Sequence, residues 1–197
     1  MPQAFTPFGL RAVANMGSHG NEIRQYPLPN GSACPNLGRG SPVKFQLGVI
    51  CSMNVGATAG PILGVAHGFA YIDPTTKRLT HASQIPAGTS SAGLVDGETR
   101  PIAYITDSAE ALFMVQADAS VTAADFGKNF DVTASGGDVD SVYGVSRYAL
   151  KASSRSVSAD LPCKVVGIAK IIDNAWGDPF PIVVVKLNTN MAQAAGV

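Results

Sequence analysis

The fold class is decided by one stretch near the end of the chain, residues 182–187, with the sequence Ile-Val-Val-Val-Lys-Leu. This is the most strongly β-branched run of the chain, and β-branched side chains suit a pleated sheet better than a helix. A continuous apolar run of this length is typical of a strand that is covered on both faces. We therefore expect it to be a central strand.

Other strand-like segments come before it. Residues 42–47 alternate between apolar and polar side chains, which places Val43, Phe45 and Leu47 on one face. The apolar run at 61–72 contains two glycines and predicts a bulged or sharply coiled strand. Segments 101–106 and 111–116 predict a hairpin around the turn 107–110. Shorter strands are expected at 130–132, 142–143, 148–150 and 163–169.

One short helical turn is expected at residues 121–127. Thr122 suits the N-cap, and Asp125 stands where a capping-box acid accepts from the N-cap backbone. Val121 and Phe126 take the hydrophobic-staple positions, and Gly127 ends the turn.

The composition points to the same fold class. Charged residues are 14% of the chain, against roughly 25% in an ordinary soluble domain, while 21 glycines and 13 prolines supply many turns. No long segment has helical periodicity, and the Ser-rich segment 149–159 is interpreted as an exposed connection. The sequence predicts an all-β protein, a small β-barrel or β-sandwich with one short helical turn and a long irregular N-terminal arm.

The N-terminal arm, residues 1–41, is rich in proline and glycine yet carries apolar side chains at intervals. Those most suited to anchor it are Phe5, Phe8, Leu10 and Tyr26. A disordered linker is poor in such residues, so the arm is expected to pack on a surface of its own domain or of a neighbouring subunit. The β-rich domain is expected at 42–190 and a loose C-terminal tail at 191–197.

Lys plus Arg and Asp plus Glu number 14 each, so the formal net charge is zero. A nucleic-acid binder normally has a basic excess that neutralises phosphates, so no nucleic-acid partner is expected. No stretch approaches the ~20 apolar residues of a membrane span, so no membrane partner is expected either. A weakly charged, neutral surface favours association with other proteins.

No arrangement typical of catalysis is visible. The chain has no G-x-S-x-G nucleophile motif and no phosphate-binding loop of the G-x-x-x-x-G-K-[ST] type. The three histidines, His19, His67 and His81, are not clustered. We therefore expect no enzyme activity, no catalytic residues, no cofactor and no metal.

Three cysteines are widely spaced and form no C-x-x-C pair, which argues against a zinc or thioredoxin-type site. They are Cys34, Cys51 and Cys163. We interpret them as buried free thiols in a reducing compartment.

The loop 173–180 carries the only tryptophan, Trp176, between two apolar strands. Asn174, Gly177 and Pro179 favour a fixed turn there. Trp176 is expected either to cap one end of the barrel or to anchor a subunit interface, where Trp is enriched.

Four segments also resemble a known family. They are FTPFGLR at 5–11, GSPVKF at 40–45, ILGVA at 62–66 with Gly68 and Tyr71 after it, and DNAWGD at 173–178. Together they resemble the decoration, or cement, proteins of tailed-bacteriophage heads, and DNAWGD is the most distinctive of them. The resemblance spans most of the chain.

The resemblance implies a virion protein that is made in the host cytoplasm and binds the outer capsid surface after the shell expands. Its partner would be the major capsid protein, whose neighbouring copies it bridges, and it would self-associate, as a trimer in preference to a dimer. The expected contact residues are Phe5, Phe8, Leu10, Tyr26 and Trp176. The alternatives are a head–tail connector or tail protein, and a small β-barrel ligand-binding protein or hydrolase.

Overall fold

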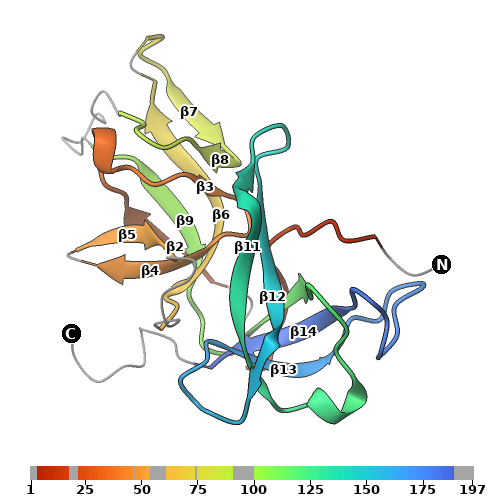
Figure 1. Ribbon diagram of the computed structural model, residues 1–197. Coiled ribbons are helices and arrows are strands. Elements are labelled where there is room, and N and C mark those ends of the chain that lie inside the picture. Colours follow the sequence, from red (N-terminus) through yellow and green to blue (C-terminus); the bar gives the residue numbers. More distant parts are fainter. Residues whose placement is uncertain are drawn as a thin grey trace.

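The computed structural model describes residues 4–17, 22–46, 48–53, 61–73, 75–90 and 100–188. Its regular structure is almost entirely antiparallel strands (Figure 1). In these ranges the helical elements are two short 3₁₀ turns, η1 (Gly31–Ala33) and η2 (Ala123–Asp125). The expected all-β class is confirmed.

The first sheet has six strands in the order β1-β10-β14-β13-β11-β12. They are β1 (Arg11–Asn15), β10 (Ala111–Gln116), β11 (Asn129–Asp140), β12 (Val145–Ser156), β13 (Cys163–Ile168) and β14 (Ile182–Leu187). The β-branched run is β14, and its central position between β10 and β13 is confirmed. The sheet curls, because the Asp118 N–H, just after β10, donates to the Leu150 carbonyl of edge strand β12 at 2.9 Å.

The second sheet has the order β2-β9-β6-β4-β5, and β7 also pairs with β6. Its strands are β2 (Ile23–Pro27), β4 (Pro42–Gln46), β5 (Val49–Ser52), β6 (Gly64–Ile72), β7 (Leu79–Ala82) and β9 (Ile102–Thr106), and a separate pair is formed by β3 (Leu37–Gly38) and β8 (Gln84–Ile85). The register of β6 against β9 shifts between Ala66 and Gly68, so the expected bulge is confirmed.

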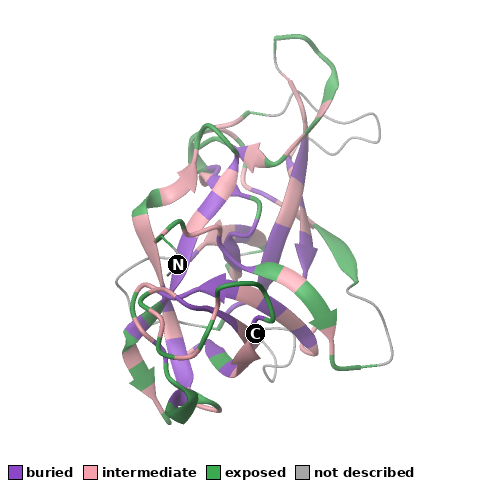
Figure 2. Ribbon diagram, turned by 90° about the vertical axis from the view of Figure 1, so that its right-hand side faces the viewer, coloured by how far each residue is buried: buried purple, intermediate pink, exposed green. Residues whose placement is uncertain are grey.

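The buried side chains form two clusters, one mostly on each sheet, and Figure 2 shows buried residues on strands in both halves of the molecule. The first cluster includes Phe113, Phe130, Val183 and Val185. The second includes Leu28, Leu37, Val43, Phe69 and Ile105.

The long β11–β12 hairpin, which forms one edge of the first sheet, connects the two halves of the molecule. In Figure 1 it extends from the first sheet alongside the second. Its turn contacts the β3–β4 connection: Arg39 N–H donates to the Gly144 carbonyl at 3.0 Å, and Ser146 N–H donates to the Arg39 carbonyl at 2.9 Å. The two sheets are therefore held together by backbone hydrogen bonds.

The expected hairpin of residues 101–106 and 111–116 is wrong, although both segments are strands. β9 belongs to the second sheet and β10 to the first, so the turn 107–110 crosses between sheets. Local turn signals predict that the chain reverses there. They carry no information on the partners that each strand finds elsewhere in the sequence.

Two further expectations need correction. The arm is not irregular throughout, because β1 and β2 lie within residues 1–41 and pair with β10 and β9. The segment 149–159 is not simply a connection, since β12 continues to Ser156. The expected tail at 191–197 lies outside the described residues.

Candidate binding site

Residues 4–10, here called the leading segment, lie against the first sheet and are fixed by Gln116. Thr6 N–H donates to Gln116 Oε1 at 2.8 Å, and Gln116 Nε2 donates to the Ala4 carbonyl at 2.9 Å. Because Gln116 is buried, its side-chain amide forms hydrogen bonds with these backbone groups and not with water. The Phe5 ring packs on Phe180, with ring centroids 5.2 Å apart.

The leading segment then crosses the β3–β4 connection at two glycines. Gly9 N–H donates to the Tyr148 carbonyl at 3.1 Å, and Leu10 N–H donates to the Gly40 carbonyl at 2.9 Å. Gly9 and Gly40 both have positive φ, and a Cβ on Gly9 would lie 2.5 Å from the Gly40 oxygen and from Ser146 Cβ. Only glycine allows the two backbones to approach this closely.

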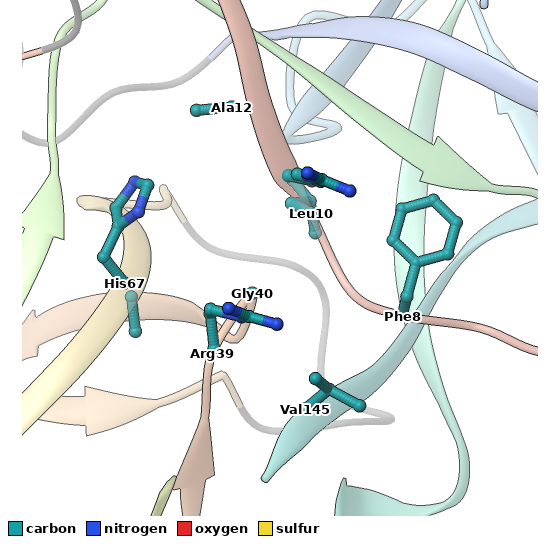
Figure 3. Close-up of a pocket in the computed structure, with 9 residues that line it drawn as sticks. Phe8, Leu10, Ala12, Arg39, Gly40, His67 and Val145 are labelled. Atoms are coloured by element: carbon teal, nitrogen blue, oxygen red, sulfur yellow. The ribbon is translucent and has the colours of Figure 1, made fainter. Parts of the chain in front are cut away.

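A pocket of about 290 Å³ lies beside this crossing (Figure 3). It is bordered by the chain from Phe8 to Ala12, by the β3–β4 connection, by β6 and by the start of β12. Figure 3 shows Phe8 and Val145 on one side and His67 on the other, with the Arg39 side chain extending toward Phe8 and Val145. The pocket is therefore shared by the two sheets and the leading segment.

The pocket is basic. Its lining includes Arg11, Arg39 and His67, and none of the described residues that border it is acidic. His67 Nε2 shares a 2.6 Å hydrogen bond with the Thr106 hydroxyl. Burial lowers the pKa of His67, and the positive charge of Arg39 lowers it further, so the imidazole is neutral at pH 7.

The loop around Trp176 is held by side chains on both sides of it. The Asn174 amide donates to the Ala169 and Ile182 carbonyls and accepts from the Ile182 N–H, each at 2.8 Å. Ala175 N–H donates to Asp178 Oδ2 at 2.8 Å. Trp176 is partly buried against the first core cluster, which agrees with the expected cap at one end of that sheet.

Tyr26 lies on β2 and contacts its own chain. Its ring packs edge-on against Phe45, with centroids 6.2 Å apart, and its hydroxyl donates to Asp107. Arg24 donates to the same carboxylate at 3.2 Å, so the buried Asp107 is paired where the chain crosses between sheets. Desolvation raises the pKa of Tyr26, as does the hydrogen bond to Asp107.

The five expected contact residues are thus not one surface. Leu10 is in the first core, and its side chain is 1% exposed, so it is left out of any contact surface. Phe8 borders the pocket, whereas Phe5, Tyr26 and Trp176 are half-buried and pack on their own chain. The described part of the arm therefore packs on its own domain, one of the two possibilities left open by the sequence.

No spacing or motif in the sequence connects Arg39 with His67. They are separated along the chain and come together only because Gly40 N–H donates to the Ala66 carbonyl, at 2.8 Å. The available signal was His67 itself, a polar residue that interrupts an apolar strand. His19 lies outside the described residues.

The cysteines are free thiols, as expected, and Cys34 and Cys163 are buried. Burial raises the pKa of Cys34 to about 11 and that of Cys163 to about 12, so both are uncharged and weakly nucleophilic at neutral pH. Cys51 is half-buried on β5. Across the described ranges no group of three or more His, Cys, Asp or Glu side chains is placed to hold a metal ion.

In the part of the chain that the structure describes, no helix has the length and apolar character to cross a bilayer. Comparison of the chain with family models, with curated proteins and with solved structures found no match.

Proposed function

We propose that this protein decorates the outer surface of a tailed-bacteriophage capsid and stabilises the shell by bridging subunits of the major capsid protein. In this role it is a structural virion protein with no catalytic step. The proposal starts from the four segments that resemble head decoration proteins.

The observation that carries the proposal is that the first three of these segments meet in space. Residues 5–11 cross residues 40–45 through the Leu10-to-Gly40 hydrogen bond, and Ser41 accepts from Ala66 N–H, in the third segment, at 3.0 Å. The Phe5 ring of the first segment packs on Phe180, two residues after the fourth segment. The three segments thus form one connected unit at the crossing of the leading segment, and this unit supports the proposal that they act together.

The arm also supplies two open strand edges. Within the described residues β1 pairs only with β10, and β2 pairs only with β9. Exposed apolar side chains lie on or beside these edges, namely Val13, Met16 and Ile23. An open edge with apolar side chains suits strand addition, in which backbone hydrogen bonds supply affinity and side chains supply specificity. Many copies on a symmetric shell allow each contact to be modest.

Co-sedimentation with expanded shells of the cognate major capsid protein tests the proposal. The full chain is expected to pellet with shells at a fixed ratio to the capsid protein. The double variant Met16→Lys with Ile23→Lys is expected to pellet less, because charge at an open edge opposes pairing. Val157→Lys, at a side chain that is 88% exposed after β12, is the matched control.

If the full chain stays in the supernatant, the decoration role is wrong. If it forms rings without shells and does not bind them, a connector role replaces it. If the double variant pellets like the control, the role of the β1 and β2 edges is wrong while the decoration role stands.

A further inference from the structure

We infer that the pocket between the sheets, bordered by Arg11, Arg39 and His67, binds a carboxylate group carried on a short apolar stem. This site does not depend on the decoration role. The carboxylate has two possible sources, a free small carboxylic acid or an acidic side chain of a protein partner.

The pocket carries two positively charged side chains, Arg11 and Arg39. Neither Arg11 nor Arg39 forms an ion pair with any residue in the described ranges, whereas Arg24, Lys128, Arg147, Arg155 and Lys186 all do. Both arginines are exposed, so their guanidinium groups can reach a ligand that enters the pocket from solvent. An anion in the pocket faces two positive side chains, and arginine offers two parallel donors that match a carboxylate.

The Arg39 backbone and the His67 ring are fixed by hydrogen bonds. Arg39 is on a backbone held from two directions, because its N–H donates to the Ser83 carbonyl at 2.7 Å and to the Gly144 carbonyl at 3.0 Å. His67 is oriented by its hydrogen bond to the buried Thr106. The fixed Arg39 backbone and the oriented His67 ring reduce the conformational freedom that is lost when a ligand binds.

Size and lining give the class of ligand. The volume of about 290 Å³ is at the lower end of the roughly 300–1,000 Å³ of small-molecule sites. Phe8, Leu10, Ala12 and Val145 supply an apolar wall next to the basic groups. The space is sufficient for one carboxylate and a few carbons, as in a glutamate side chain.

The test is an NMR titration of the full chain, without shells, using three probes. Glutarate represents a free acid, N-acetyl-glutamate N-methylamide represents a protein side chain, and the corresponding glutamine compound is its uncharged counterpart. Saturable shifts are expected at the amides of Leu10, Ala12 and Val145. The glutamate probe is expected to bind at least roughly tenfold more tightly than the glutamine probe, since hydrogen bonds to charged groups are about twice as strong as neutral ones.

Arg39→Gln and Arg11→Gln are each expected to weaken binding about fivefold or more, with an otherwise unchanged spectrum. Arg78→Gln makes the same charge change on the exposed approach to β7 and is expected to leave affinity unaltered. Tighter binding of the blocked glutamate than of glutarate assigns the site to a protein partner, and the reverse assigns it to a small acid. Equal binding of the glutamine probe, absence of saturable shifts with both acids, or an equal loss in Arg78→Gln would overturn the inference.

Discussion

Asp125 is a buried charge with several partners, and its role is structural. The backbone N–H and hydroxyl of Thr122 both donate to its Oδ2 at 3.0 Å, and Lys128 and Arg155 contact it at 3.0 and 3.3 Å. Burial alone would raise the pKa of Asp125, but these hydrogen bonds and the charge of Arg155 outweigh it and hold the pKa at about 2. The carboxylate therefore connects η2 to β12.

Asp125→Asn is expected to lower the free energy of unfolding at pH 7 by about 1–2 kcal/mol, as the loss of a helix cap does. The folded pKa of about 2 is below the roughly 3.9 of an unfolded aspartate, so the stabilisation is complete above about pH 5 and is lost as pH falls through 2. Urea unfolding at pH 7 and at pH 2.5 measures the loss of stability and its dependence on pH. Asp160→Asn, at an exposed carboxylate, is the control, and a pH-independent deficit in Asp125→Asn would contradict the account.

Tyr26→Phe tests whether Tyr26 is a structural residue of its own chain. It removes the hydroxyl that donates to the buried Asp107 and is expected to cost about 1–2 kcal/mol of stability. Tyr143→Phe is the matched control, because that side chain is 74% exposed at the β11–β12 turn. Equal urea midpoints for the two variants would show that the Asp107 contact does not stabilise the fold.

At the scale of the element, the crossing of the leading segment and the β3–β4 connection depends on glycine. Gly9→Ala is expected to cost about 2 kcal/mol or more, because it combines a positive φ of 75° with a clash against Gly40 and Ser146. Gly167→Ala, where a Cβ meets nothing within 4 Å, is the control. Thermal unfolding compares them, and a Gly9→Ala chain as stable as the control would mean that the leading segment is not docked.

The contribution of Trp176 to stability can be tested in the loop 173–180. Trp176→Ala is expected to lower stability by up to about 3 kcal/mol, less than for a fully buried Trp because the side chain is partly exposed. Phe126→Ala removes an aromatic ring that is 62% exposed and is expected to change the urea midpoint little. Similar urea midpoints for the two variants would show that Trp176 does not cap the first core cluster.

Elements with strong local chemistry were predictable from the sequence. The β-branched run became the central β14, and the capping pair Thr122 and Asp125 forms as expected, with Gly127 at a φ of 81° after it. Phe126 was expected to pack as a staple but is exposed. The β1 and β2 strands were missed because edge strands lack the alternation of a half-buried strand, and their partners are remote in the sequence.

The pocket shows the limit of sequence reasoning more sharply. Arg11, Arg39 and His67 are brought together by a backbone crossing, and no spacing rule connects them. Leu10 was predicted to contact a partner, because it is an apolar residue in the arm. Its side chain instead completes the core of its own chain. Which surface an apolar residue covers is set by tertiary contacts.

At the scale of the whole molecule, two sheets with separate cores are joined by the β11–β12 hairpin and by the arm, which contributes an edge strand to each sheet. With no net charge and only 14% charged residues, long-range repulsion between copies is weak. Such a surface suits close packing of many copies on a lattice, where open edges and small apolar contacts act together.

Shell stability tests this account most directly, because a protein that binds only the assembled shell must stabilise it by mass action. Expanded shells of the cognate capsid protein are heated with increasing amounts of the full chain, and disassembly is followed by light scattering. We predict that the disassembly temperature rises and then saturates at a fixed ratio of this protein to capsid protein. An unchanged disassembly temperature at saturating protein would contradict the account.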